Sequence, residues 1–417
     1  MKLQHFTKTL LICLSITSSL SSRAQKYTSY KGLVMAGYQG WFNTPEDGAN
    51  RKWNHYAGKG GKFEPGSCKF DLWPDMDEYK QKYKTPFQFA NGQPAYLFSS
   101  YDESTVDLHF KWMKEYGIDG VFLQRFVVTL SSEKGRNHSD KVLRSVLKAA
   151  KKYDRTVAIM YDLSGMKAEQ YSIVEEDWKH IINDFEINNP KKYKNYLFHN
   201  GKPLVAIWGI GFNDNRKYGF EEANKIVDFL KAPSQYGNCA IHLGVPARWR
   251  ELKTDATEDP QLHTIIRKAD IVHPWFVGRY KDNKSYTRFK NLIREDIAWC
   301  KENKIDYVPT VFPGFSWYNM KKDTPSDMIP RNKGNFFWMQ IAGAIESGAE
   351  MIYIAMFDEI DEATAIFKCS HEVPVGESKF LPIENEVKTD HYLWLSGMAK
   401  KMLSKQIPFQ DKQPQRP

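Results

Sequence analysis

The chain has 417 residues, a formal net charge of +9 at pH 7 and five cysteines. The basic residues are spread along the chain and alternate with acids, which argues against a track that binds nucleic acid. The same excess would help to attract a polyanionic glycan. No C-x-x-C pair occurs, so neither a structural zinc site nor a disulfide scaffold is expected, although an exported protein of this kind allows one disulfide.

Residues 1–24 have the pattern of a secretory signal peptide. Lys2 and Lys8 precede an apolar core over residues 10–20, and a Ser-Arg-Ala cleavage motif occupies residues 22–24. Cleavage removes three basic residues and no acid, so the net charge becomes 9 − 3 = +6. The apolar core is too short to span a bilayer and no longer apolar segment follows, so we expect a secreted or periplasmic protein without a transmembrane segment.

Apolar runs with the length of buried strands recur eight times along the chain. They cover residues 32–38, 120–126, 156–161, 203–208, 239–245, 271–276, 307–312 and 351–357. Amphipathic helical stretches fill most of the gaps, at residues 106–116, 139–153, 221–230, 282–301 and 331–347, and residues 391–403 form a closing helix. This alternation predicts the α/β class and a (β/α)8 TIM barrel, as a single domain over residues 25–407.

Four segments depart from this alternation. Residues 43–96 are rich in Gly, Lys and Pro and too long for an ordinary loop, which predicts a structured insertion over one end of the barrel. Residues 191–201 predict a small hairpin that ends in an Asn-Gly turn. Residues 368–387 predict a further loop excursion, and the tail at residues 408–417 is predicted to be disordered.

The last apolar run leads into the motif Phe357-Asp358-Glu359-Ile360-Asp361-Glu362-Ala363-Thr364. Barrels of this kind hold their chemistry just beyond the carboxyl ends of the strands. Glu359 and Glu362 can face one pocket only if the chain turns after Phe357, because residues three apart in a strand point to opposite faces. Paired carboxyl groups suit the cleavage of a glycosidic bond. The alternative is a solvated acidic turn.

The other strand ends add polar and aromatic side chains, which we take as candidate substrate-binding residues. They are Tyr38, Trp41, Gln124, Arg125, Tyr161, Asp162, His242, Trp275, Arg279, Trp317 and Tyr318. A single His or Trp at a strand end is more often a packed residue, but their convergence fits a sugar cleft. No nucleotide cradle, nucleophilic serine elbow or calcium loop is present, so no cofactor and no metal are expected.

Several blocks of the sequence resemble glycoside hydrolase families 71 and 99, whose best-known members are endo-acting α-mannosidases. Residues 38–43 (Tyr-Gln-Gly-Trp-Phe-Asn) and 52–56 (Lys-Trp-Asn-His-Tyr) resemble the family blocks Tyr-Pro-Trp-Tyr and Trp-x-His-Trp, and residues 99–102 and 331–337 are similar too. The family's end block is Phe-Asn-Glu-Trp-His-Glu-Gly-Thr, so both glutamates and their spacing match. The resemblance covers nearly the whole mature chain and adds His55 and Asp102 to the substrate-binding candidates.

By this resemblance Glu362 would be the general acid/base, and Glu359 would act as a base on the sugar's 2-hydroxyl, with retention through a 1,2-anhydro sugar. The spacing alone equally permits a direct nucleophile. The family's Ser-Trp-Tyr after the second strand is Gln124-Arg125-Phe126 here, and its Trp-His between the glutamates is Ile-Asp. Arg125 beside the reacting sugar would favour a carboxylated or sulfated substrate, and a salt bridge to Asp162 or Asp361 is an equally open alternative.

The sequence therefore predicts an exported, retaining glycoside hydrolase for an α-linked glycan, similar to the bacterial subgroup loosely labelled xylosidase/arabinosidase. The expected partner is a poly- or oligosaccharide, with an anionic glycan as one candidate, and a monomer is expected. Two alternatives stay open. One is a barrel that binds glycans without cleaving them, and the other is a lyase that acts on uronic acids, which Arg125 and the tyrosines suggest.

Overall fold

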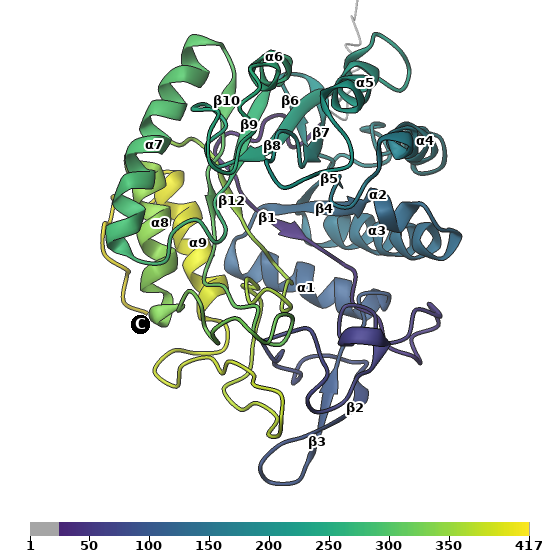
Figure 1. The fold of residues 1–417 in the computed structure, drawn as a ribbon, viewed down its shortest axis with the longest axis vertical. Helices are drawn as coiled ribbons and strands as arrows, with labels where there is room; N and C mark the ends of the chain where they lie inside the picture. Colours follow the sequence, from purple (N-terminus) through teal and green to yellow (C-terminus); the bar gives the residue numbers. More distant parts are fainter. Residues whose placement is uncertain (1–24, 417) are drawn as a thin grey trace, which may run out of the picture.

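The computed structural model describes residues 25–416, so the predicted signal peptide lies outside the described residues. At its centre is a parallel β-barrel (Figure 1). The barrel strands are, in the order in which they pair, β1 (Val34–Tyr38), β4 (Gly120–Phe126), β5 (Thr156–Asp162), β7 (Lys202–Trp208), β8 (Ala240–Pro246), β9 (Ile271–Trp275), β10 (Asp306–Tyr307) with β11 (Thr310–Val311), and β12 (Ile352–Ile354). β12 pairs in parallel with β1 and completes the ring.

The seventh strand of the barrel is divided into β10 and β11 by Val308 and Pro309. β10 pairs with β9 and β11 pairs with β12, so each half bonds to a different neighbour. The interruption is short, because Val308 N still donates to Val272 O at 2.9 Å and Pro309 O accepts from Tyr353 N at 3.2 Å. Eight strands therefore close the barrel, which confirms the predicted (β/α)8 fold.

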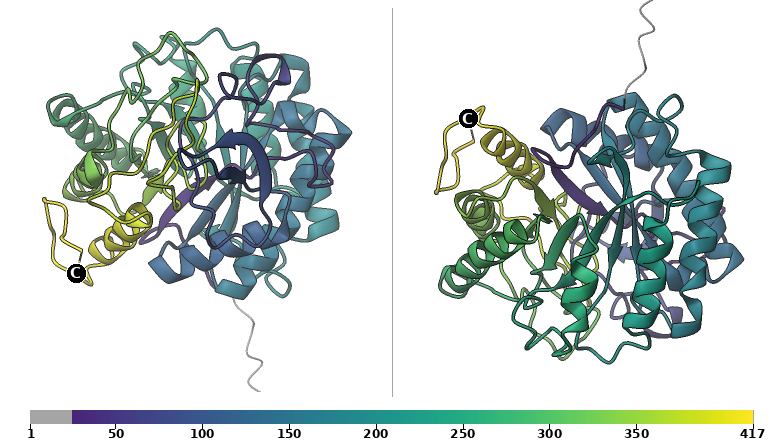
Figure 2. Two further views of the ribbon diagram at one scale, coloured as in Figure 1. Left: turned by 90° about the horizontal axis from the view of Figure 1, so that it is seen from below. Right: turned by 90° about the horizontal axis from the view of Figure 1, so that it is seen from above.

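Helices surround the barrel (Figure 2). The helices that the sequence predicts are present as α1 (Glu103–Tyr116), α3 (Glu133–Tyr153), α5 (Phe220–Lys231), α7 (Asn283–Glu302), α8 (Asn335–Glu346) and α9 (His391–Leu403). Three helices were not predicted: α2 (Val127–Leu130), α4 (Ser172–His180) and α6 (Gln261–Ile266). They are too short to show a clear helical period. Single turns occur at η1 (Lys59–Gly61), η2 (Ala168–Gln170), η3 (Ile181–Phe185) and η4 (Asn332–Gly334).

The long segment after β1 is a structured insertion, as predicted. It contains the antiparallel hairpin of β2 (Tyr83–Gln88) and β3 (Pro94–Leu97). Isolated bridges tie it to the loop that follows β12, among them Leu72 with Leu381 and Gln88 with Val375. Because both segments follow the carboxyl ends of barrel strands, together they cover that end of the barrel (Figure 2, left).

Two smaller predictions have different outcomes. The Asn-Gly turn joins β6 (Phe198–His199) to the start of β7 in an antiparallel hairpin, and Asn200 and Gly201 both have the positive φ that such a turn needs. The tail, in contrast, lies along α8 and α9. Trp338 Nε1 donates to Gln410 O at 3.1 Å, and Arg416 pairs with Asp390. The composition that suggested disorder does not reveal such contacts.

Within residues 25–416, no helix is long and apolar enough to cross a membrane. The cysteines of this range, Cys68, Cys239, Cys300 and Cys369, are buried and unpaired. The same residues contain no group of three or more His, Cys, Asp or Glu side chains arranged to hold a metal ion.

Candidate active site

The chain turns sharply after β12, which is the condition for both glutamates to face one pocket. A turn spans residues 360–363, and Thr364 N donates back to Glu359 O at 3.1 Å. Arg331 holds this turn from outside, because its Nη2 donates to the carbonyl oxygens of Ala363 and Ala365 at 2.9 and 2.7 Å. We call residues 357–366 the candidate catalytic turn, or the catalytic turn for short.

The carboxyl group of Glu359 is buried and fixed by two donors. Gln39 Nε2 donates to Oε1 at 2.6 Å and Thr364 Oγ1 donates to Oε2 at 2.8 Å. Burial, and then the nearby charges of Glu362 and Asp361, raise the pKa of Glu359 well above its usual value, while the two donors act to lower it. When Glu362 holds its proton, the charge that opposes ionisation of Glu359 is removed and the two donors favour the carboxylate, so Glu359 is the member of the pair better placed to act as a base.

The carboxyl group of Glu362 is partly exposed. Burial and the charge of Asp361 raise its pKa to about 8, against the indole N–H of Trp317 and the ammonium of Lys321, which lower it. Glu362 is therefore protonated near neutral pH and can exchange its proton with a bound molecule, as a general acid must.

The two aspartates of the catalytic turn connect it to the segment after β1. Asp358 accepts from the backbone N–H groups of Gln39 and Gly40 at 2.7 and 2.9 Å, which ties the last strand of the barrel to the first. Asp361 Oδ2 lies 3.2 Å from His55 Nδ1. Burial raises the pKa of each aspartate to about 7.

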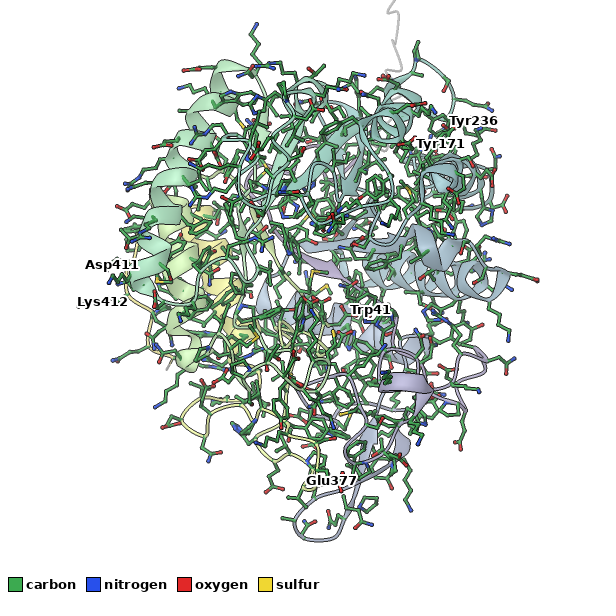
Figure 3. All side chains as sticks on the ribbon, in the orientation of Figure 1. Trp41, Tyr171, Tyr236, Glu377, Asp411 and Lys412 are labelled. Atoms are coloured by element: carbon green, nitrogen blue, oxygen red, sulfur yellow. The ribbon has the colours of Figure 1, made fainter. Side chains whose placement is uncertain are left out.

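His55 joins the catalytic turn to an aromatic surface. Its ring is stacked on Trp41, with centroids 3.7 Å apart and planes 8° apart, and Trp41 lies between the barrel and the insertion (Figure 3). Burial and the charges of Arg51 and Lys69 lower the pKa of His55 to about 3, so the imidazole is neutral and its contact with Asp361 is a hydrogen bond. The two stacked rings cover one another, so a sugar ring could pack only against the part of this aromatic pair that stays exposed.

An acid of the insertion places Trp317 beside Glu362. Asp71 is fully buried and accepts from the backbone N–H groups of Tyr318 and Asn319 at 2.8 and 2.9 Å, and from the hydroxyl of Ser316. Ser316 N donates to Glu362 O at 3.0 Å. The loop after β11 is therefore held between the insertion and the catalytic turn.

The inner face of the barrel supplies the opposite side of the site. Trp208 and Trp275 meet edge to face with centroids 5.3 Å apart. Gln124 Nε2 donates to Tyr353 OH at 3.2 Å. Burial raises the pKa of Asp162 to about 6, and the charge of Asp162 contributes to the raised pKa of Glu362. Of the predicted residues, Gln124, Asp162 and Trp275 therefore face the barrel interior.

Comparisons with known proteins agree with this geometry. Residues 144–375 match the family described as Domain of unknown function (DUF5010). The chain belongs to the DUF5010 family.

The DUF5010 chain is similar in sequence to two mammalian mannosidases and in fold to a bacterial one. It is 21% identical over 349 residues to the glycoprotein endo-alpha-1,2-mannosidase of Rattus norvegicus, an alignment that covers 81% of this chain and 68% of the relative, and the Mus musculus protein of the same name is equally similar. The GH99 endo-alpha-mannosidase structure from Bacteroides thetaiotaomicron has a TM-score of 0.67 at 16% identity, over 90% of this chain and 99% of that one. The resemblance to families 71 and 99 is confirmed, and these relatives are glycoside hydrolases, in agreement with the predicted enzyme class.

In the DUF5010 chain, Arg125 and Tyr161 do not face the site. Arg125 is 1% exposed, and its Nε and Nη2 bond to Asp177 and Asp140 at 2.8 and 3.0 Å. Tyr161 OH donates to Asp177 at 2.8 Å. Arg125 and Tyr161 are direct neighbours in the sheet register, so both point outward to α3 and α4. The salt bridge predicted as an alternative exists, but its partners are neither Asp162 nor Asp361.

Tyr38 and His242 are also not positioned as predicted. Tyr38 is buried on the outer face of β1, with its hydroxyl 2.8 Å from His109 Nδ1 of α1. Its neighbour Gln39 occupies the site instead. His242 is fully buried deeper in the barrel, with ring centroids 4.9 Å from both Phe122 and His273.

Three further candidates lie at the margin. Arg279 is 37% exposed and pairs with Asp255 at 2.8 Å. Asp102 accepts from Tyr83 OH at 3.1 Å just before α1. Tyr318 is held by its backbone, and Lys379 lies 5.2 Å over its ring. None of these three has a contact with Glu359 or Glu362.

The structure adds four residues that are absent from the list of substrate-binding candidates: Gln39, Asp71, Arg331 and Thr364. All four act by holding the catalytic turn or the loop beside it. Gln39 could have been chosen over Tyr38 if the inward face of β1 had been known. The other three are ordinary polar residues whose partners lie far away in the sequence.

Proposed function

We propose that the chain is a retaining glycoside hydrolase for an α-linked glycan, with Glu362 as general acid/base and Glu359 as the assisting base. The supporting observation is the difference between the two carboxyl groups. Glu359 is buried and held by two hydrogen-bond donors, whereas Glu362 is partly exposed with a pKa raised to about 8. Two carboxyl groups in such different surroundings take different roles.

In the first step, Glu362 gives its proton to the leaving glycosidic oxygen while Glu359 removes the proton of the sugar's 2-hydroxyl. The 2-oxygen attacks the anomeric carbon, the glycosidic bond breaks, and a 1,2-anhydro sugar forms. In the second step, Glu362 takes a proton from water, the water oxygen opens the anhydro ring, and Glu359 returns the proton to the 2-oxygen. Two inversions at the anomeric carbon give net retention. This route follows the resemblance to families 71 and 99.

The α-linkage is proposed from the relatives, which are named endo-alpha-mannosidases. The aromatic side chains at the site, namely the pair Trp41 with His55 and the pair Trp275 with Trp208, are consistent with a glycan in this place. The observation that suggested a lyase is weaker, because Arg125 and Tyr161 point away from the site.

The variant Glu362→Gln tests the proposal. We expect it to lose turnover of unactivated glycans by about 100-fold or more, because loss of a general acid has at least that effect. An aryl α-glycoside with a good leaving group should still undergo the first step in this variant, whereas Glu359→Gln should fail with both substrates. Normal turnover of a natural glycan by Glu362→Gln would overturn the assignment. Tight glycan binding by the unmodified protein with no released sugar would instead favour a binding barrel.

We also propose that the protein is exported, from the signal-peptide pattern of residues 1–24. Expression of the full chain in its native host, followed by fractionation and N-terminal sequencing, tests this. A mature N-terminus at residue 25 in the exported fraction is expected, and an intact N-terminus in the cytoplasm would contradict it.

A further inference from the structure

A basic cavity of about 780 Å³ lies between the insertion and the loop after β11, beside the catalytic turn. Its charged lining residues are all cations: Arg51, Lys52, Lys59, Lys69 and Lys322. No Asp or Glu lines it. The remaining wall includes the half-buried ring of Trp53 and the amide of Asn319. Five cations around one cavity without a lining acid would attract a negatively charged group.

His55 connects the cavity to the catalytic turn. His55 lines the cavity, and its Nδ1 lies 3.2 Å from Asp361, between the two glutamates in the sequence. The charge of Lys69 reaches the same place, because it acts to lower the pKa values of both Asp361 and His55. A sugar in the cavity would therefore be next to the sugar at the glutamates.

Arg51 is the least compensated of these cations. Its Nη1 is buried without a hydrogen-bond partner, and within residues 25–416 the side chain forms no ion pair. Burial lowers the pKa of Arg51, and the charge of Asp47 offsets this only in part. Arg51 also borders a small recess shared with Gln39, Trp41 and Gln124, so it lies between the basic cavity and the barrel mouth. Buried guanidinium groups are normally paired, as Arg125 is here.

Among the described residues, the lysines of the cavity also have no acidic partner, so their charges are free to attract an anion. Within the described part of the chain, Lys52, Lys59 and Lys69 make no ion pair, and Lys322 donates to the carbonyl oxygen of Gly66. Lysine ammonium groups act as point charges, whereas an arginine pairs with a planar or tetrahedral anion through two parallel hydrogen bonds. The cavity therefore offers one directional donor and several mobile charges.

We propose that this cavity is an anion-binding subsite that recognises a sulfate ester or a carboxylate on the sugar next to the one at the glutamates. The proposal rests on the glycosidase function proposed above and names its substrate class, an acidic glycan. Arg51 would bind the anionic group, the lysines would add charge, and Trp53 would contact the ring. It replaces the sequence-based expectation that Arg125 makes this contact.

Calorimetric titration tests the subsite without relying on turnover. The protein is Glu362→Gln, and the probes are two matched pairs of equal length: dextran sulfate and dextran oligosaccharides, and oligogalacturonate and its methyl ester. We expect at least one anionic probe to bind ten times more tightly than its neutral match, with the advantage shrinking at high salt. The sulfate and carboxylate arms show which group the subsite prefers.

Two further variants localise the binding. Arg51→Gln, and the double change Lys59→Gln with Lys69→Gln on exposed side chains, should each weaken the anionic probe at least fivefold and leave the neutral probe unchanged. Lys401→Gln, a matched exposed lysine on α9, should change neither. Equal binding of charged and neutral probes, or anionic binding that survives both cavity variants, would overturn the subsite. Failure of the glycosidase proposal shows separately, as turnover of a neutral glycan by Glu362→Gln.

Discussion

The side-chain amide of Gln39 donates to Glu359 Oε1 at 2.6 Å, across 320 residues of sequence. An amide N–H cannot accept a proton from the carboxyl group, so this contact favours the ionised form of Glu359. The first strand of the barrel thereby helps to set the charge of a residue that follows the last.

Gln39→Leu should raise the pKa of Glu359 further, because it removes a donor to the carboxylate. Since Glu359 must be ionised to act as a base, turnover at pH 6 should fall by about tenfold, the effect of losing roughly one charge-assisted hydrogen bond, and recover partly at higher pH. The measurement is a pH profile of kcat/KM. Thr364→Ser keeps its hydroxyl donor and should leave the profile unchanged. A parallel loss at every pH in Gln39→Leu would contradict this account.

The raised pKa of Glu362 makes stability depend on pH. The folded chain keeps this proton up to about pH 8, whereas the unfolded chain loses it near pH 4.5, so the free energy of unfolding falls as pH rises through that interval. Glu362→Gln should remove the loss, and the variant should be about 1–2 kcal/mol more stable than the unmodified protein at pH 9, with a smaller difference at pH 5. Urea denaturation at both pH values measures it. Glu221→Gln, on the exposed surface of α5, serves as the control, and a Glu362→Gln difference that does not grow with pH would refute the prediction.

Arg125 should matter for stability and not for substrate choice. Arg125→Met leaves Asp177 and Asp140 without their buried partner, which should cost about 3–5 kcal/mol in the free energy of unfolding. Adding Asp177→Asn should recover part of that loss. The ratio of kcat/KM for charged and neutral substrates should be the same as in the unmodified protein. A change in this ratio would return Arg125 to the substrate site.

Arg331→Met should loosen the catalytic turn. The variant keeps an unbranched apolar stem but loses both hydrogen bonds to the turn, so we expect a fall of about tenfold in kcat and a loss of about 2 kcal/mol in stability. Kinetics on an aryl glycoside and chemical denaturation measure the two effects. Arg294→Met, which removes an exposed ion pair with Glu346, should change neither by much. A rise in KM with kcat unchanged would speak against a role in holding the turn.

The barrel could be predicted because each strand is an uninterrupted apolar run of the right length. The same property hid which side chains point inward. In a barrel covered by helices, both faces of a strand are apolar, so the sequence of the run does not show which alternate residues point into the barrel. Gln124 with Arg125, and Tyr161 with Asp162, are consecutive pairs, and only one member of each pair can face the interior.

The partners of the outward residues could not be predicted either. Asp177 lies on the unpredicted helix α4, and Asp71 lies in the insertion, where no periodic pattern indicates its contacts. The two glutamates could be named as candidates because a strand end and a family block coincide there. Arg51 could not be named from the sequence, because a cation can be recognised as unpaired only when its neighbours in the structure are known.

The bonds of Gln39 and Gly40 to the catalytic turn join the two ends of the barrel in sequence, so the ring must close before Glu359 is held in place. Contacts this distant along the chain form late and slowly when a protein refolds. Helix content should therefore return first after dilution from denaturant, and enzymatic activity should return only with ring closure. Recovery of activity thus measures when the first and last strands of the barrel come together during refolding.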